Sequence, residues 1–117
     1  MNIARATAAL ALLAAAGCWP AHPAAPEEDA LDVYEDAEAL FKKGRYEDAA
    51  PGYEFVIKAR DRWRDPYVKL ALCHEAAGRD RQAVAVLERL LVVDRTDAEG
   101  LKLLAKINAR LEAAGKP

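Results

Sequence analysis

From about residue 27 onward, apolar residues recur every three or four positions, with charged residues between them. Tyr53, Val56 and Ile57 form one such group, and Val84 and Leu87 begin another. This spacing places the apolar side chains on one face of a helix. Helices are therefore expected over about residues 27–43, 46–60, 66–77 and 98–114, with another that begins at residue 80.

Residues typical of helix ends support these boundaries. Gly44 and Gly78 follow the first and third helices, where a glycine closes a helix in the left-handed conformation. Asp65, just before a proline, is expected to cap the third helix, and Asp80 the fourth. The residues 96–99, Thr-Asp-Ala-Glu, have the spacing of a capping box and predict the start of the last helix.

Pro51 lies about six residues into the second predicted helix. A proline there removes the backbone hydrogen bond to Glu47 and crowds its carbonyl group. Gly52 loosens the helix further. We therefore expect a kink, or a delayed start of this helix.

A spacing of 34 residues relates several positions along the chain. The two turn glycines are 34 residues apart. The same spacing separates the alanines that precede each glycine by seven residues and the alanines that follow it by five. It also separates the aromatic or leucine residue found four positions after the latter alanine. The residues concerned are Ala37, Ala71 and Ala105; Gly44 and Gly78; Ala49 and Ala83; and Tyr53 and Leu87. Tyr46, two residues after the first glycine, belongs to the same signature in the first repeat. A period of this length indicates a helix–turn–helix solenoid.

The pattern resembles that of the tetratricopeptide repeat (TPR) family. The resemblance implies an all-α fold, a short TPR-like helical solenoid over residues 27–114. It contains about two repeats, residues 30–63 and 64–97, and a C-terminal capping helix, residues 98–114. Such arrays bind proteins along the groove lined by the first helix of each repeat.

The N-terminal residues 1–17 have the features of a signal peptide: Arg5 is their one charged residue, and the apolar run 6–16 is too short to span a bilayer. The residues 15–18, Ala-Ala-Gly-Cys, resemble a bacterial lipobox. That resemblance implies that Cys18 carries acyl chains such as palmitate and anchors the protein in the cell envelope, on the periplasmic face of the outer membrane. Cleavage after Ala16 is the alternative. Prolines at every third position make 18–26 an extended tether.

Composition, charge and motifs limit the classes of function that this protein can have. The net charge is −2, with acids and bases interspersed, which argues against nucleic-acid binding. Cys73 and His74 are adjacent, so on a helix their side chains diverge by about 100° and do not form a catalytic pair. We find no phosphate loop, catalytic serine motif or metal-ligand spacing. The sequence therefore indicates a non-enzymatic protein without a cofactor.

The TPR resemblance implies a partner-binding groove on the first, third and fifth helices. Its residues are Tyr34, Glu38, Phe41 and Lys42, then Val68, Lys69, Leu72 and Glu75, then Lys102, Lys106 and Arg110. Glu35 and Glu38 make one wall acidic, and the row 102, 106, 110 makes the other basic. A groove with opposite charges at its ends would orient a bound peptide.

Two functions are compatible with these features. One is an envelope lipoprotein that presents its TPR module to a protein partner as an adaptor or assembly factor. The other is a structural subunit that self-associates through residues 98–114, where Leu103, Leu104, Ile107 and Leu111 lie on one arc of the helix.

Overall fold

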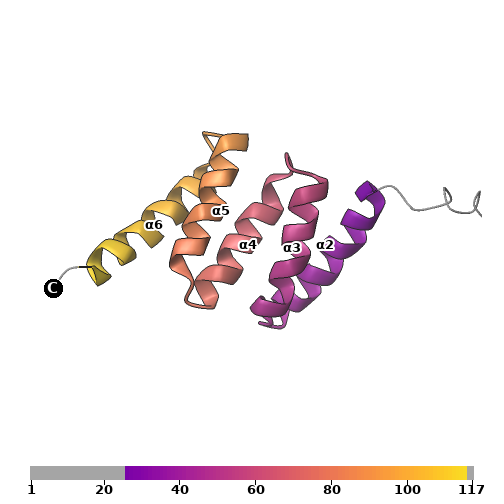
Figure 1. The fold of residues 1–117 in the computed structure, drawn as a ribbon, viewed down its shortest axis with the longest axis horizontal. Coiled ribbons are helices and arrows are strands. Elements are labelled where there is room, and N and C mark those ends of the chain that lie inside the picture. The colour runs from indigo at the N-terminus through magenta and orange to yellow at the C-terminus, as the bar shows by residue number, and fades with distance from the viewer. Residues whose placement is uncertain (1–25, 116–117) are drawn as a thin grey trace, which may run out of the picture.

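The structure is a computed structural model that describes residues 26–115. Five helices follow one another: α2 (Pro26–Lys42), α3 (Tyr46–Ala59), α4 (Arg64–Ala76), α5 (Asp80–Val93) and α6 (Ala98–Ala114). They lie side by side in chain order, from α2 at one end of the array to α6 at the other (Figure 1). The described residues contain no strand. The all-α helical repeat expected from the sequence is confirmed.

Both turn glycines adopt the conformation that their positions require. Gly44 and Gly78 each have φ of +78°, in the left-handed region. The backbone N–H of the next residue reaches back five residues in each case, from Arg45 to Leu40 and from Arg79 to His74. This is the Schellman arrangement, which satisfies carbonyl groups at the end of a helix. The two repeats therefore turn in the same way.

Two predictions about helix starts are wrong by one or two residues, and for α6, which begins at Ala98 as predicted, only the capping residue differs. α4 begins at Arg64, so Asp65 lies inside it, and the N-cap Trp63 makes no side-chain cap. Asp80 is the first residue of α5 and not its cap. The cap of α6 is Asp97, whose carboxylate accepts a hydrogen bond from the Gly100 N–H at 2.8 Å, in place of the Thr96 capping box. Asp65 and Asp80, which cap no helix, pair with arginines, and Asp97 pairs with Arg64 in addition to capping α6.

α3 runs without interruption from Tyr46 through Pro51, so its start is not delayed. Pro51 is exposed. Gly52 has a packing role that the sequence did not show. A Cβ atom at this position would lie 3.0 Å from the Cβ of Ala37 on α2, tighter than most real contacts. The glycine therefore lets α3 lie close against α2.

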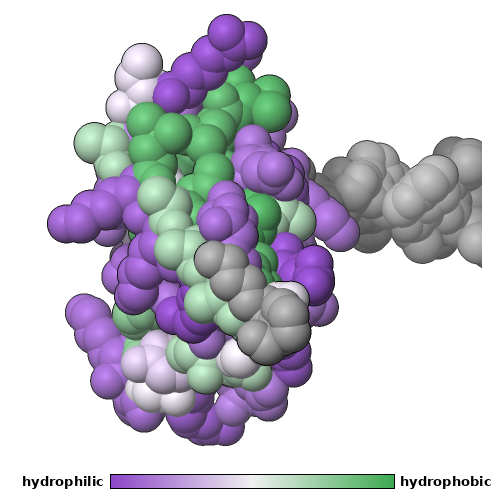
Figure 2. Space-filling model, turned by 90° about the vertical axis from the view of Figure 1, so that its left-hand side faces the viewer, coloured by the Kyte–Doolittle hydropathy of each residue, from purple (hydrophilic) through white to green (hydrophobic). Residues whose placement is uncertain are grey.

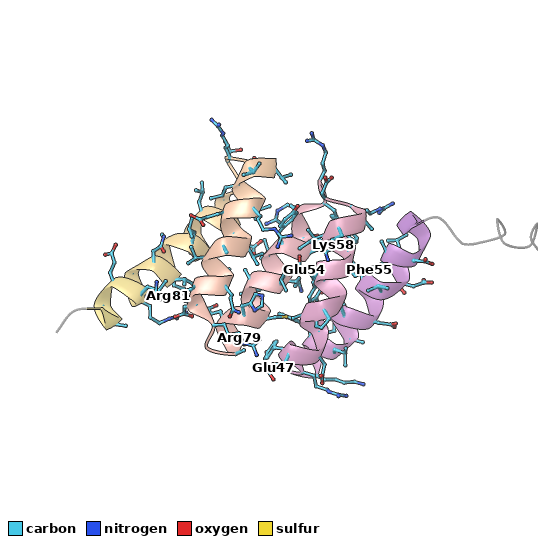
Figure 3. The ribbon with its side chains drawn as sticks, in the orientation of Figure 1. Glu47, Glu54, Phe55, Lys58, Arg79 and Arg81 are labelled. Atoms are coloured by element: carbon cyan, nitrogen blue, oxygen red, sulfur yellow. The ribbon has the colours of Figure 1, made fainter. Side chains whose placement is uncertain are left out.

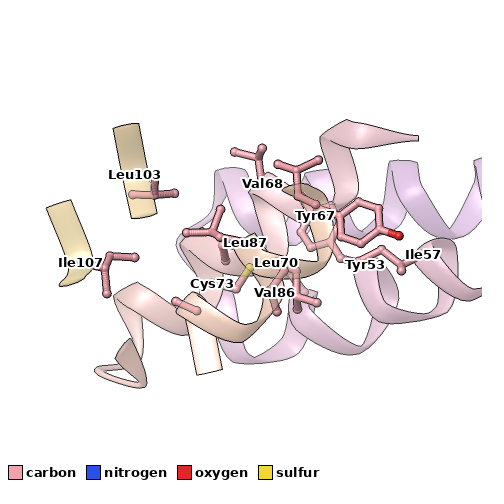
Figure 4. Packing of buried hydrophobic residues seen from close by; sticks show 14 of the residues in the cluster. Tyr53, Ile57, Tyr67, Val68, Leu70, Cys73, Val86, Leu87, Leu103 and Ile107 are labelled. Carbon is pink, nitrogen blue, oxygen red and sulfur yellow. The ribbon is translucent and has the colours of Figure 1, made fainter. Parts of the chain in front are cut away.

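The core runs through the array from Ala37 on α2 to Ile107 on α6. Figure 4 shows its residues on α3 to α6. The alanines at the predicted crossings, Ala37, Ala49, Ala71 and Ala83, are at most 2% exposed. Tyr53 and Leu87, four residues after the second alanine of each repeat, are fully buried. Among the described residues, the buried side chains of this core lie between positions 37 and 107.

α6 differs from the sequence interpretation in two ways. Leu103 is 8% exposed and Ile107 fully buried, so these two residues of the arc expected to drive self-association belong to the core, whereas Leu104 and Leu111 are only partly buried. Ala105 was expected at a close crossing, like Ala37 and Ala71, but it is exposed. In the described chain α6 packs against α5 and, less extensively, α4, and no helix covers its Ala105 side.

Candidate functional site

The first helix of each repeat, together with α6, contributes to one side of the array, which we call the first-helix face: α2, α4 and α6. Ten of the eleven predicted groove residues are at least partly accessible. Val68 is the exception. It is 4% exposed and belongs to the core, so its assignment to the groove is wrong.

Charges on the α2 half of this face are neutralised within the chain. Glu38 accepts a hydrogen bond from the Tyr53 hydroxyl. Lys69 Nζ lies 3.4 Å from Glu38 Oε1 and 4.5 Å from the centre of the Phe41 ring, a cation–π distance. Burial, and then the hydrogen bond to Glu38, raise the pKa of Tyr53. The predicted acidic wall is therefore reduced to the exposed Glu35.

The basic row on α6 is partly neutralised in the same way. Glu75 on α4 has two cationic partners, Lys106 at 3.2 Å and Arg110 at 2.9 Å, and Arg110 also binds Asp80 at 2.7 Å. These contacts use α6 cations to hold α6 against α4 and α5. Lys102 is exposed and has no ion-pair partner among residues 26–115.

Two adjoining pockets lie on the first-helix face, and both are lined by Leu72 and Lys106. One, of about 240 Å³, is also lined by Phe41, Tyr46, Glu75 and Ala76. The other, of about 430 Å³, is also lined by Glu99, Lys102 and Leu103. The Glu99 carboxylate is held by Arg64 at 2.9 Å. The pockets are thus apolar hollows with ammonium groups at the rim.

Aromatic rings line the start of this face, and the sequence interpretation missed one of them. Trp63 packs on Tyr34, with ring centres 4.4 Å apart and planes tilted by 42°. Tyr34 also meets Tyr53 edge to face at 5.8 Å. Burial, and then the nearby Glu38 and Asp65, raise the pKa of Tyr34 to about 12. The sequence did contain a signal for this contact. Trp63 lies in a short polar turn, and a large aromatic side chain there needs a packing partner.

Tyr34 and Lys42 line neither pocket. Tyr34 is half-buried beneath Trp63, and Lys42 is exposed at the end of α2. The predicted residues that meet around the two pockets are Phe41, Leu72, Glu75, Lys102 and Lys106.

The Cys73 and His74 side chains form no pair in which one activates the other. Cys73 is 1% exposed, and burial raises the pKa of its thiol to about 11, so the thiolate is scarce at neutral pH. The Nδ1 atom of His74 is buried without a hydrogen-bond partner in the described chain. Burial, and then the nearby Arg79, lower the pKa of His74.

The opposite side of the array, formed by α3 and α5, carries ion pairs between repeats. Glu47 lies 2.9 Å from Arg79 (Figure 3). Glu54 lies 2.9 Å from Arg89. Phe55 is 44% exposed on this side. These pairs join α3 to the next repeat. Two further pockets lie beside their arginines: one of about 370 Å³ is lined by Arg89 and Val92, and one of about 420 Å³ by Arg79 and Arg81.

The 34-residue register, the matched glycine turns and the buried alanine crossings agree with a comparison against family models, in which residues 40–107 match the tetratricopeptide repeat. This chain belongs to the tetratricopeptide repeat family. TPR repeats generally mediate protein–protein interactions, and the first-helix face is where this TPR array has its adjoining pockets.

A comparison with curated proteins found no match for this TPR chain. Among residues 26–115, no helix combines the length and the apolar character needed to span a bilayer. In the same range, no three His, Cys, Asp or Glu side chains are grouped so as to hold a metal ion. The predicted signal segment, Cys18 and the tether lie mostly outside the described residues.

Proposed function

We propose that the protein is a non-enzymatic adaptor of the bacterial cell envelope, anchored through Cys18, whose TPR module binds a segment of a partner protein on the first-helix face. The observation that carries the proposal is the pair of adjoining pockets on either side of Leu72. A single extended or short helical segment spans two such pockets with two apolar side chains.

The charges around the pockets define what the segment carries. Glu75 and Glu99 are already bound by cations of this chain. Lys102 keeps a free positive charge beside the larger pocket. The segment therefore has two apolar anchors with an acidic group near the second. Anchors seated in pockets dominate affinity, whereas an exposed charge mainly sets orientation and association rate.

The binding face is tested by photocrosslinking in intact cells of the source bacterium. A photoreactive residue replaces Leu72 in one variant and, as the matched control, Phe55 on the opposite side in another. We expect a discrete product from position 72 that is missing from position 55. Purified captured protein should then bind the wild type, bind Phe55→Ala equally well, and bind Leu72→Ala more weakly by over about 1 kcal/mol.

Two results would contradict this binding face. One is crosslinking from position 55 and none from position 72. The other is a purified partner that binds Leu72→Ala normally and loses binding on Phe55→Ala. Either would place the partner on the α3 and α5 side.

The anchor is tested separately, through Cys18. In the lipobox interpretation, the thiol is acylated before the signal segment is removed. Cys18→Ser should therefore abolish incorporation of labelled fatty acid and leave an uncleaved precursor. Normal processing of the variant would instead support cleavage after Ala16 and a protein without a lipid anchor. This outcome leaves the proposed binding face unaffected.

A further inference from the structure

His74 occupies a position that the first repeat fills with an aliphatic residue. The residue 34 positions earlier is Leu40, which packs against the core. The residue 34 positions later is Asn108, which is exposed on α6, at an end of the array whose surface mixes polar and apolar residues (Figure 2). The amide of Asn108 is therefore open to water. The Nδ1 atom of His74 is instead buried, with no hydrogen-bond partner in the part of the chain that the structure describes.

The turn that follows His74 is built like the turn that follows Leu40. Each contains a glycine with φ of +78°. The Arg79 N–H donates to the His74 carbonyl at 2.8 Å, and the Arg45 N–H donates to the Leu40 carbonyl at 2.9 Å. The Ala77 N–H also donates to the His74 carbonyl, at 3.1 Å. Two turns with the same backbone arrangement therefore differ in that one of them begins at a residue that can take up a proton.

The surroundings of His74 oppose a proton on its ring. A proton on Nδ1 would create a buried N–H group without an acceptor, which is unfavourable. Arg79, at the N-cap of α5, disfavours the imidazolium, and Glu54, on α3, favours it. Arg79 is paired with Glu47, and Glu54 is paired with Arg89, each at 2.9 Å. Burial, and then Arg79, accordingly lower the pKa of His74.

We propose that protonation of His74 opens the turn between α4 and α5, so that the junction between the two repeats is sensitive to acid. In the open turn, water solvates the imidazolium, and the repulsion from Arg79 is relieved. Ala76, the last residue of α4, lines the smaller pocket of the first-helix face. Opening the turn therefore releases part of one pocket wall. This last consequence rests on the proposed function, to which it adds release of the partner in acid.

The pH range of the effect is set by the pKa of His74 in the two forms of the turn. In the open form the pKa has its ordinary value of about 6.5, and in the closed form it is lower. The open form therefore binds the proton more tightly. Opening becomes more favourable as the pH falls below about 6.5, and the effect levels off below the pKa of the closed form.

Amide hydrogen exchange in the full chain tests the proposal, measured by NMR from neutral to mildly acidic pH and corrected for the intrinsic exchange rate. The N–H groups of Ala77 and Arg79 report on the turn that follows His74. The matched control is the N–H of Arg45, in the turn where Leu40 takes the place of His74. We expect the protection of Ala77 and Arg79 to fall in acid and that of Arg45 to stay unchanged.

Two variants identify the group that titrates. His74→Gln keeps a polar side chain that takes up no proton, and it should abolish the acid-dependent loss of protection. It also assigns the ring signals of His74, because the chain has two histidines and the variant keeps one. Arg79→Gln removes the neighbouring cation, so the NMR titration midpoint of His74 should rise in this variant.

Three results would overturn the proposal. The first is a titration midpoint of His74 at or above about 6.5 in the wild type. The second is protection of Ala77 and Arg79 that does not depend on pH. The third is an equal loss of protection at Arg45, which would indicate acid unfolding of the whole array. All three are measured without a partner, so they do not depend on whether the first-helix face binds a protein.

Discussion

Asp97 joins α6 to the rest of the array through two interactions, and removing its carboxylate should be among the more destabilising polar substitutions. Its side chain is 5% exposed. One oxygen caps α6 by accepting the Gly100 N–H, and both oxygens accept hydrogen bonds from the Arg64 guanidinium at the start of α4. Loss of a helix cap costs about 0.5–2 kcal/mol, and hydrogen bonds to charged groups contribute about 1.5–3 kcal/mol. In Asp97→Ala, Arg64 still has Asp65 and Glu99 as ion-pair partners. The substitution should therefore lower the free energy of unfolding by about 2–3 kcal/mol, less than the sum of the two contributions.

Urea denaturation followed by circular dichroism measures this change, and two further variants divide it. Asn caps helices about as well as Asp, so Asp97→Asn should retain the cap and lose only the charge interaction, for about 1–2 kcal/mol. Glu99→Gln removes a more exposed partner of the same arginine and should cost below about 1 kcal/mol. In a double-mutant cycle, the cost of Asp97→Asn should largely disappear when Arg64→Met is already present.

The pH dependence of stability gives an independent check on the role of Asp97. The hydrogen bonds from Arg64, and the Gly100 N–H more weakly, hold the pKa of the Asp97 carboxyl below its ordinary value. In the unfolded chain the pKa of this carboxyl is about 3.9, and in the folded protein it is lower. Asp97 therefore stabilises the fold above about pH 3.9, and this contribution is lost as the pH falls through the lower pKa of the folded state. Asp97→Asn should therefore flatten the acid side of the stability curve. If Asp97→Ala costs no more than Glu99→Gln, the assignment of Asp97 as a structural centre is wrong.

Three further predictions concern the repeats. Ala83→Leu should overpack the α4–α5 crossing and lower the free energy of unfolding by about 1–3 kcal/mol. The control Ala85→Leu, at an exposed position of the same helix, should change it by under about 0.5 kcal/mol. Equal melting temperatures for the two variants would refute the 34-residue register. Gly78→Ala should cost about 1 kcal/mol in urea denaturation solely because of its φ of +78°, since no atom lies within 4 Å of the added Cβ. Burial lowers the pKa of His74 in the folded protein. The free energy of unfolding should therefore fall as the pH drops below about 6.5, the pKa of histidine in the unfolded chain, and His74→Leu should remove this pH dependence. An unchanged pH dependence in the variant would count against the burial of His74.

The repeat itself was readable from the sequence. Gly44 and Gly78 could be assigned to turns because a left-handed backbone strongly favours glycine, and Ala49 and Ala83 to crossings because their 34-residue spacing repeats that of the glycines. Helix starts were less certain. Asp65 and Asp80 have the residue type of a cap, but both lie within the first turn of a helix, where their carboxylates pair with arginines.

The proposed binding face was only partly predictable. The structure places Leu72 and Lys106, both expected there, at the two pockets. The TPR resemblance implied which helices line the face. It did not show which charges remain available, because the partners of Glu38, Glu75 and Arg110 come from other helices. Val68 was placed in the groove by the TPR resemblance, but it is 4% exposed, because the packing of neighbouring helices decides which positions of α4 are covered.

The sequence alone determined the helices, their repeat and their turns, because these depend on local backbone preference and on apolar spacing within one helix. The tertiary structure decided what each side of α6 contacts. Ile107 is buried and Ala105 is exposed, although both fit an apolar helix face, because α5 covers one side of α6 and no described helix covers the other. Contact between helices depends on the whole array, and so does the surface left for a partner.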